Sequence, residues 1–330
     1  MREAEEDAWA NPSSPNAAGR RAAARLDLAR RAVADSLGVP ARAVRFTSGA
    51  TEANAWALRG RRVLASAVEH PSVRAWAGGT VPVDGEGRVR LDALDAAVRS
   101  GAWDLVSVMA ANNETGVLQP IEEVAAVCRR HGVPLHVDAA QMPGRLPIPA
   151  VGDLMTLTSH KCGGPRGAGV LVVRGEEPTP LLRGGPQERG SRAGTEAVVP
   201  IIGLAAALCR TLPPFDPGPR DALDAAVRRL GGEVIGAGAP RLPNTCCALF
   251  SAPGDLLVMA LDLAGISAST GSACSSGAAR PSDVLAAMGR PGQVPVRFSL
   301  GRADRDTAGA VAALERALAA LEETCGWSSP

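Results

Sequence analysis

The sequence contains no tyrosine and a single lysine, Lys161, among its 35 lysines and arginines. The first absence excludes a catalytic phenol. The second is informative because arginine stays protonated, whereas a desolvated lysine can lose its proton, attack a carbonyl carbon and form a Schiff base. Lys161 lies in "LTSHKCGGPRGAG", residues 157–169, between a histidine and a glycine-rich turn. It is either a reactive amine or a solvated loop charge in an arginine-biased sequence.

Long apolar runs, net charge and regularly spaced cysteines are lacking too. The longest apolar run, "AVVPIIGLAAALC" from Ala197, is too short to cross a bilayer, and the N-terminal "MREAEEDAWA" lacks the apolar core of a signal peptide. A net charge of +1 provides no strong field for nucleic acid or an anionic membrane. Seven cysteines without repeated spacing favour neither disulfides nor a zinc site. We therefore expect a cytoplasmic protein with no metal site and no nucleic-acid or membrane partner.

The apolar pattern predicts an α/β fold. A chain of 330 residues, 46% of them hydrophobic, can bury a large core and form about two domains. Short apolar runs alternate with helical stretches, which predicts a mostly parallel sheet covered by helices. The predicted strands include "VRF", "RVLASAV", "DLVSVMA", "VPLHVD", "DLMTLTS" and "GAGVLVV", and the predicted helices include "GATEANAWALRG", "LDALDAAVRS" and "PIEEVAAVCRRHG".

A proline-rich hinge, "TLPPFDPGP" at residues 211–219, marks the expected domain boundary. We expect a large domain over residues 12–212 and a smaller α+β domain over residues 213–330, with residues 1–11 a candidate to pack on the smaller one. The smaller domain is predicted to contain a helix from about Arg220, a strand at "NTCCALFSA", a helix at "DLLVMALDLAGI" and a long helix that opens near "ADRDTAGAV".

Polar residues follow five of the predicted strands. In open α/β sheets, ligands bind at the carboxyl ends of the strands, so these segments are expected to form one cleft that contains Lys161. This grouping favours a reactive amine over a solvated charge. The segments are "TSGATEAN" after "VRF", Glu69-His70-Pro71, Asn112-Asn113-Glu114, Asp138 to Gln141, and Thr158 to Lys161.

Two of these segments suggest a cofactor. The small-residue turn "SGATEAN", residues 48–54, opens a helix whose free N–H groups suit an anion, although most such turns are simple helix caps. Asp138 ends a buried strand, where a carboxylate needs a cationic partner; a salt bridge or a pyridinium nitrogen would serve. A Schiff-base lysine, an anion turn and a buried aspartate together indicate pyridoxal phosphate chemistry.

The motifs carry a family resemblance as well. In order along the chain, from about Asn11 to Arg302, they are "FTSGATEAN", "EHPSV", "NNETGVLQPI", "HVDAAQ", "SHKCGGPRGAG", "RGGPQERGSRAGTEA", "RLPNT", "TGSACSSG" and "VRFSLGR". The sequence resembles the cysteine desulfurases of the aminotransferase class V group. The resemblance implies a type I pyridoxal-phosphate-dependent transferase fold, in which the large domain binds the cofactor and the small domain carries the catalytic cysteine loop.

The resemblance also implies residue roles. Lys161 would hold the cofactor and later move the substrate's α-proton, and His70 would stack on the cofactor ring and assist proton transfer. Asp138 would pair with the pyridine nitrogen, and Gln141 would bond the phenolic oxygen. The phosphate ligands would be Ala50 through its backbone, Thr51, Thr158, Ser159 and His160. Thr195 would reach the cofactor of a partner subunit in a homodimer. Asn113 and Arg297 would lie near the cofactor and the substrate carboxylate.

Among the cysteines, Cys274 is the expected nucleophile. It lies in "STGSACSSGAARP", a small-residue loop that no helix or strand would bury, whereas Cys128 and Cys209 lie in predicted helices and Cys246 and Cys247 in a predicted strand, where cysteine is usually inert. Cys162, beside Lys161, is either reactive or packed under the turn. The resemblance implies that the Cys274 thiolate attacks the sulfur of L-cysteine, which leaves a persulfide on Cys274, releases L-alanine and supplies an iron–sulfur scaffold or another sulfur acceptor.

Two alternatives remain at this stage. A selenocysteine lyase, or another class V lyase, would share the cofactor residues. The other alternative is a non-catalytic homologue that serves as a binding scaffold. It stays open because the family usually opens with a segment like "YLDNNATTP", and the ten residues before "NPSS" here do not resemble it.

Overall fold

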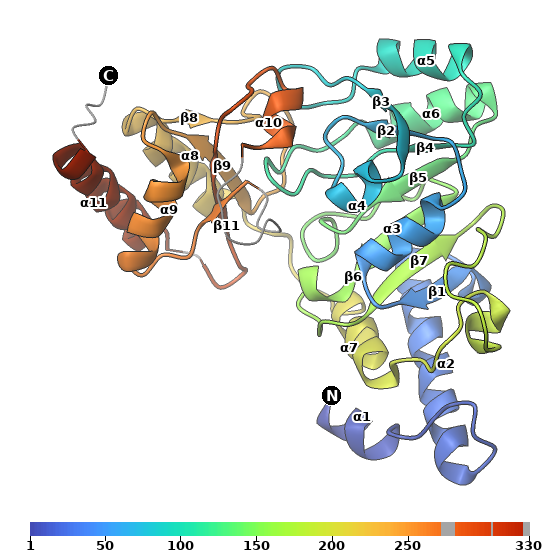
Figure 1. Ribbon diagram of the computed structural model, residues 1–330. Coiled ribbons are helices and arrows are strands. Elements are labelled where there is room, and N and C mark those ends of the chain that lie inside the picture. The colour runs from blue at the N-terminus through green and yellow to red at the C-terminus, as the bar shows by residue number, and fades with distance from the viewer. Residues whose placement is uncertain (272–280, 305, 326–330) are drawn as a thin grey trace. The chain divides into compact units, whose positions relative to one another are not determined.

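The computed structural model describes residues 1–271, 281–304 and 306–325, apart from the side chains of residues 324 and 325 (Figure 1). The chain divides into two compact units. The first comprises Met1–Val81, Leu91–Ala110 and Pro120–Pro213, and the second comprises Pro82–Arg90, Ala111–Gln119 and Pro214–Pro330. The second unit thus includes two excursions from the N-terminal half of the chain, which the sequence analysis had assigned entirely to the larger domain.

The first unit contains a seven-stranded sheet in the order β1-β7-β6-β5-β4-β2-β3. Its strands are β1 (Val44–Thr47), β2 (Val63–Ser66), β3 (Ala77–Val81), β4 (Leu105–Ser107), β5 (Leu135–Asp138), β6 (Leu154–Thr158) and β7 (Gly169–Val173). Its helices are α1 (Arg2–Asp7), α2 (Ala17–Leu37), α3 (Ala50–Leu58), α4 (Pro71–Arg74), α5 (Leu91–Ser100), α6 (Ile121–His131) and α7 (Val198–Leu208), with 3₁₀ turns η1 (Ala41–Ala43), η2 (Ser159–Lys161) and η3 (Gln187–Gly190).

Six strands of this sheet run parallel, and β7 alone runs against its neighbours β1 and β6. A parallel neighbour would need a long crossover, and the short glycine-rich link between β6 and β7 permits only an antiparallel pairing. The carboxyl ends of β1, β2, β4, β5 and β6 therefore lie at the same edge of the sheet. The predicted α/β fold with a mostly parallel sheet is confirmed.

Helix α3 fixes one side of this edge. Its buried face, which includes Trp56 and Leu58, packs on Leu105, Leu154 and Leu171 of the sheet, and all five side chains are almost fully buried. Burying a large apolar side chain contributes about 1.5–3 kcal/mol, so this contact anchors the helix firmly. The beginning of α3 is thereby held at the carboxyl edge of the sheet.

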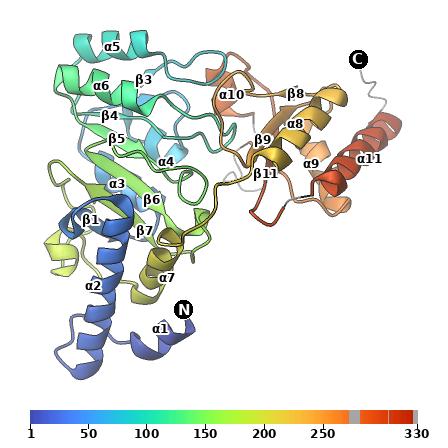
Figure 2. The same ribbon diagram turned by 180° about the vertical axis from the view of Figure 1, so that it is seen from behind.

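Helix α2 forms because its sequence is alanine-rich and both ends are capped. The Asn16 side chain accepts the Gly19 N–H at 2.9 Å, and Gly38 ends the helix in the left-handed conformation. Helices α2 and α7 lie side by side (Figure 2). Ala8, just after α1, is buried with Ala22 and Val198, so the N-terminal residues pack on the first unit rather than on the C-terminal domain.

The second unit contains a four-stranded antiparallel sheet in the order β10-β11-β9-β8, with helices packed against it. Apolar residues of β8, β9 and β11 form one core with those of the helices α8, α9 and α11. The strands are β8 (Glu233–Val234), β9 (Thr245–Leu249), β10 (Ser269–Thr270) and β11 (Val296–Ser299), and the helices are α8 (Gly218–Arg229), α9 (Gly254–Leu263), α10 (Asp283–Ala287) and α11 (Ala308–Cys325). Among the described residues of both units, no helix has the length and apolar character needed to cross a membrane.

Candidate active site

The beginning of α3 is a turn whose backbone N–H groups suit an anion. Among the described residues, no side chain caps this helix, whose first residues are Ala50 and Thr51, so its dipole and N–H groups face the edge of the sheet. A Cβ atom added to Gly49 would lie 3.8 Å from Thr158 Oγ1, which shows that Thr158 faces the turn from β6. Strand β7 approaches more closely, since a Cβ on Gly169 would lie 2.6 Å from Gly49 Cα.

Lys161 lies just after β6, in the turn η2, and its side chain is exposed. Thr158 and Ser159 are buried, and the Thr158 hydroxyl lies 3.1 Å from His160 Nδ1. The pKa of His160 is lowered by partial burial and by the charges of Lys161 and Arg166. The turn therefore presents a hydroxyl, a neutral imidazole and an amine near the beginning of α3.

Asp138 ends β5 and is buried, with 6% of its surface exposed. Its Oδ1 accepts the Ala140 N–H at 3.0 Å, and its Oδ2 accepts the Asn54 side-chain amide at 2.8 Å. The two donors fix the orientation of the carboxylate. The sequence analysis quoted Asn54 within "SGATEAN" but assigned it no role.

His70 follows β2 and is half-buried. Its Nδ1 accepts the Ser72 backbone N–H at 3.1 Å and lies 2.7 Å from the Ser72 hydroxyl. Burial lowers the pKa of His70; the charges of Lys161 and Arg74 lower it further, and the Asp138 carboxylate opposes them. His70 thus responds electrostatically to both Lys161 and Asp138, which places the three predicted site residues in one neighbourhood.

Two further predicted residues of the first unit lie at its surface. Gln141 is half-buried three residues beyond β5, and its backbone carbonyl accepts a hydrogen bond from Arg145 at 2.8 Å. Thr195 is exposed and lines a cavity together with Ser48 and Arg192.

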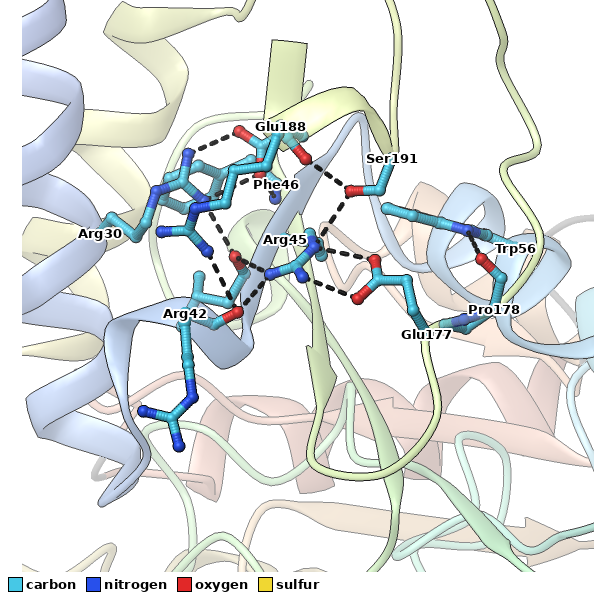
Figure 3. Close-up of polar contacts among 11 residues, drawn as sticks. Arg30, Arg42, Arg45, Phe46, Trp56, Glu177, Pro178, Glu188 and Ser191 are labelled. Atoms are coloured by element: carbon cyan, nitrogen blue, oxygen red, sulfur yellow. Dashed lines mark hydrogen bonds and ion pairs between the residues drawn. The ribbon is translucent and has the colours of Figure 1, made fainter. Parts of the chain in front are cut away.

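A pair of ionic contacts positions the segment that carries Thr195. Arg192 donates to both carboxylate oxygens of Glu52, in the first turn of α3, at 2.8 and 3.1 Å. Although burial acts to raise it, the pKa of Glu52 is lowered by hydrogen bonds from Arg192 and Ser48. Upstream, Glu188 is buried in an ion pair with Arg30 (Figure 3). The two ion pairs therefore hold the segment of chain that precedes Thr195.

The second unit contains the other predicted residues. Arg297, on β11, donates from Nη1 to the backbone carbonyl of Asn113 at 2.7 Å and to that of Gly271 at 3.3 Å. The structure therefore brings Asn113 and Arg297 together within this unit. Cys274 lies outside the described residues.

The comparisons with known proteins agree with this geometry. Residues 1–211 match the family described as Aminotransferase class-V. This chain belongs to the class V aminotransferase family. It is similar to a cysteine desulfurase of Cereibacter sphaeroides, with 42% identity over 88% of this chain and 84% of that protein, and to cysteine desulfurase NifS of Azotobacter vinelandii, with 38% identity over 89% and 81%. A solved structure of a NifS-like protein from Rickettsia africae superposes with a TM-score of 0.84 at 27% identity, covering 94% of this chain and 92% of that one. The resemblance inferred from the motifs is confirmed.

Members of the class V family use pyridoxal phosphate, and the donors in the first unit fit this cofactor. The uncapped N–H groups at the beginning of α3, together with the Thr158 hydroxyl that faces Gly49, suit a phosphate. Asp138 is a buried carboxylate that suits a protonated ring nitrogen, and Lys161 is an amine that suits the aldehyde carbon.

The cysteines that the structure describes in this class V chain share one electrostatic property. All five whose side chains the structure describes have a raised thiol pKa, chiefly because of burial: to about 12 for Cys128 and Cys247, and upward for Cys162, Cys209 and Cys246. The Cys162 thiol donates to the Ser159 carbonyl at 3.1 Å and packs under the turn. Cys209 differs from its predicted place inside a helix, since it follows the last residue of α7 and is exposed.

Glu69 is a buried acid that the sequence analysis named only as a strand-end residue. It is 1% exposed, and its Oε1 accepts the Ser66 hydroxyl at 2.5 Å and the Met109 N–H at 2.7 Å. Burial raises the pKa of Glu69 to about 8; the hydrogen bonds oppose this shift, and the charge of Asp138 adds to it. The folded protein therefore holds a proton that the unfolded chain releases near its ordinary pKa of 4.5.

This difference predicts a pH dependence of stability. The stabilisation from the Glu69 proton is complete below the unfolded pKa and is lost as the pH rises toward the folded value of about 8. Between these limits the loss is about 1.4 kcal/mol per pH unit. The free energy of unfolding of Glu69→Gln, measured in urea from pH 5 to 8, should lack this slope. The matched control is Glu123→Gln, on the exposed side of α6, which should keep the wild-type slope; equal slopes for all three proteins would refute the prediction.

Proposed function

We propose that this chain is a cysteine desulfurase that converts L-cysteine to L-alanine and transfers the sulfur to its own Cys274. The observation that carries the proposal is the grouping of Lys161, His70 and Asp138 at one edge of the sheet, beside the uncapped beginning of α3. Membership of the class V family supports the same assignment.

Bound pyridoxal phosphate supplies an electron sink for the carbanion that forms at the α-carbon of the substrate. The residues of the first unit hold and tune it. The beginning of α3 and the Thr158 hydroxyl bind the phosphate, and Asp138, oriented by hydrogen bonds from Asn54 and Ala140, pairs with the ring nitrogen. Lys161 moves the α-proton, as an amine can and a guanidinium cannot.

The transfer of sulfur from L-cysteine to Cys274 needs no external oxidant. The Cys274 thiolate attacks the sulfur of L-cysteine, a sulfur–sulfur bond forms, and the carbon–sulfur bond breaks with its electron pair returning to carbon. Protonation there gives L-alanine, and the products are one alanine and one persulfide per cysteine. Because their thiol pKa is raised, the five described cysteines stay largely protonated at neutral pH and are weak nucleophiles. This supports the choice of Cys274 as the nucleophile.

The remaining roles follow from the same proposal. Arg297 binds the substrate carboxylate through its planar guanidinium, with Asn113 beside it. Thr195 reaches the cofactor phosphate of a second copy of the chain, which makes the enzyme a homodimer. The persulfide passes to an acceptor protein such as an iron–sulfur scaffold, in the reducing cytoplasm that scattered free thiols favour.

The test is alanine release from L-cysteine by the purified chain with pyridoxal phosphate and a reductant. Wild-type protein should release alanine in excess over enzyme, and Cys274→Ser should reduce the rate by about 10³-fold or more because the nucleophile is lost. Cys209→Ser, at an exposed cysteine of raised pKa, is the matched control and should keep the wild-type rate. Unchanged release by Cys274→Ser would refute the role of this thiol, and selenocysteine cleavage alone would favour a selenocysteine lyase.

A further inference from the structure

The side chain of Asn54 connects two residues of the candidate active site. Its Nδ2 donates to Asp138 Oδ2 at 2.8 Å and to the Ser72 hydroxyl oxygen at 2.9 Å. An amide nitrogen carries two hydrogens, so both contacts can form at once. Asn54 is fully buried, at the inner side of α3, and therefore cannot exchange these partners for water.

The second half of the connection runs from Ser72 to His70. The Ser72 hydroxyl, which accepts from Asn54, lies 2.7 Å from His70 Nδ1 and can donate its own hydrogen there. The Ser72 backbone N–H donates to the same nitrogen at 3.1 Å. Because Nδ1 faces two donors, the proton of neutral His70 belongs on Nε2, and Nε2 is the ring nitrogen left for other contacts.

The orientation of the Asn54 amide is determined by these partners. A flipped amide would place Oδ1 against the Asp138 carboxylate and leave two acceptors facing each other. In the observed orientation Oδ1 is buried and has no hydrogen-bond partner among the described residues. An unsatisfied buried carbonyl is unfavourable, so the amide is arranged for its two acceptors at the expense of local stability.

We propose that Asn54 is a positioning residue that, through Ser72, holds the His70 imidazole and the Asp138 carboxylate in one fixed arrangement. This inference rests on the proposed function, in which both residues contact the cofactor. The chain Asp138–Asn54–Ser72–His70 joins β5, α3 and the turn after β2, which are separate elements of the sequence. A shift of the amide moves the aspartate and the imidazole together.

The test is a double-mutant cycle read by NMR of ¹⁵N-histidine in the cofactor-loaded protein. The chain has four histidines, and His70→Gln assigns the signal. Ser72→Ala removes a donor to Nδ1 and should shift its ¹⁵N resonance to higher frequency. Asn54→Ala should shift it in the same direction, although Asn54 hydrogen-bonds to Ser72 and Asp138 and not to His70 among the described residues. The double variant should shift it no further than Ser72→Ala alone.

Two further measurements complete the design. Turnover by Ser72→Ala should fall about 3- to 10-fold in kcat with little change in KM, and Ser72→Thr should restore it. The matched control is Ser107→Ala: the Ser107 hydroxyl lies 2.8 Å from Nδ1 of His136, so this variant should shift the His136 signal and leave that of His70 unchanged.

Two results would overturn the proposal. One is a His70 Nδ1 resonance that does not shift in Asn54→Ala, and the other is a shift in the double variant that equals the sum of the two single-variant shifts. If Asn54→Ala does not fold, Asn54→Ser, which is too short to reach both partners, takes its place in the cycle. The NMR cycle requires no turnover of L-cysteine, so a protein that passes it but makes no alanine would refute the proposed function and leave this inference standing.

Discussion

Replacing Lys161 with arginine should lower the conversion of L-cysteine to alanine by about 10²- to 10⁴-fold, the range expected when a positioned acid–base group is lost. Arginine keeps the positive charge but cannot lose a proton at neutral pH or attack an aldehyde. Since the Lys161 side chain is exposed, the free energy of unfolding should change by less than about 0.5 kcal/mol. Alanine release and urea unfolding of the same preparation separate the two effects.

The single lysine makes a chemical control possible. Borohydride treatment with pyridoxal phosphate should attach a pyridoxyl group to the side chain of Lys161, and mass spectrometry of the peptides should find none on the side chains of Lys161→Arg. Arg99→Lys, which places a lysine on the exposed side of α5, should keep full activity and gain no adduct at residue 99. Wild-type activity in Lys161→Arg would exclude Lys161 from catalysis and return it to the status of a loop charge.

The arginines of this chain show the opposite use of a cation. Arg30, Arg45 and Arg192 each make a two-pronged contact with a carboxylate, to Glu188, Glu177 and Glu52 respectively. The planar guanidinium matches a carboxylate in this geometry, and a lysine ammonium does not. Arginine therefore suits the structural ion pairs, and lysine is retained where an amine that can lose its proton is needed.

Much of the site could be predicted from sequence because it depends on strand ends. Apolar runs locate β2, β4, β5, β6 and β7, and the residue after a buried strand lies at the edge of the sheet whatever the details of packing. His70 and Asp138 were found in this way, and Lys161, singled out as the only lysine, was placed beside them by the same argument. Strand β3, with two glycines and an exposed side, gave no such signal and was missed.

What could not be predicted depends on contacts between distant segments. Residues 82–90 and 111–119 belong to the second unit, and no composition change marks them. Asn54 and Asp138 are 84 residues apart in the chain, and Arg30 and Glu188 are 158 apart. Partners at such separations carry no local pattern. Cys209 was placed inside a helix because the apolar run continues through it, but α7 ends one residue earlier.

Breaking the buried ion pair of Arg30 and Glu188 should strongly destabilise the first unit. Arg30 donates to Glu188 at 2.6 and 2.8 Å, the Phe46 N–H donates to the same carboxylate at 3.0 Å, and the guanidinium lies over the Phe46 ring (Figure 3). Both side chains are nearly inaccessible to water, at 8% and 1% exposure. Glu188→Ala would leave a buried charge without a partner, and it should lower the free energy of unfolding by about 3–5 kcal/mol. In a protein of this size the melting temperature should fall by about 6–20 °C.

Two companion variants identify the cause of this loss. Glu233→Ala breaks the exposed ion pair with Arg290 and should cost less than about 1 kcal/mol, because water screens that pair. Arg30→Met combined with Glu188→Met removes both charges and should regain about half of the loss, since the unpaired charge disappears while the Phe46 N–H still lacks its acceptor. Glu188 and the next residue also have left-handed backbone angles, with φ of 45° and 60°, and we expect the ion pair to hold them there. A Glu188→Ala protein as stable as Glu233→Ala would show that this segment, which leads to Thr195, is held by packing and not by the ion pair.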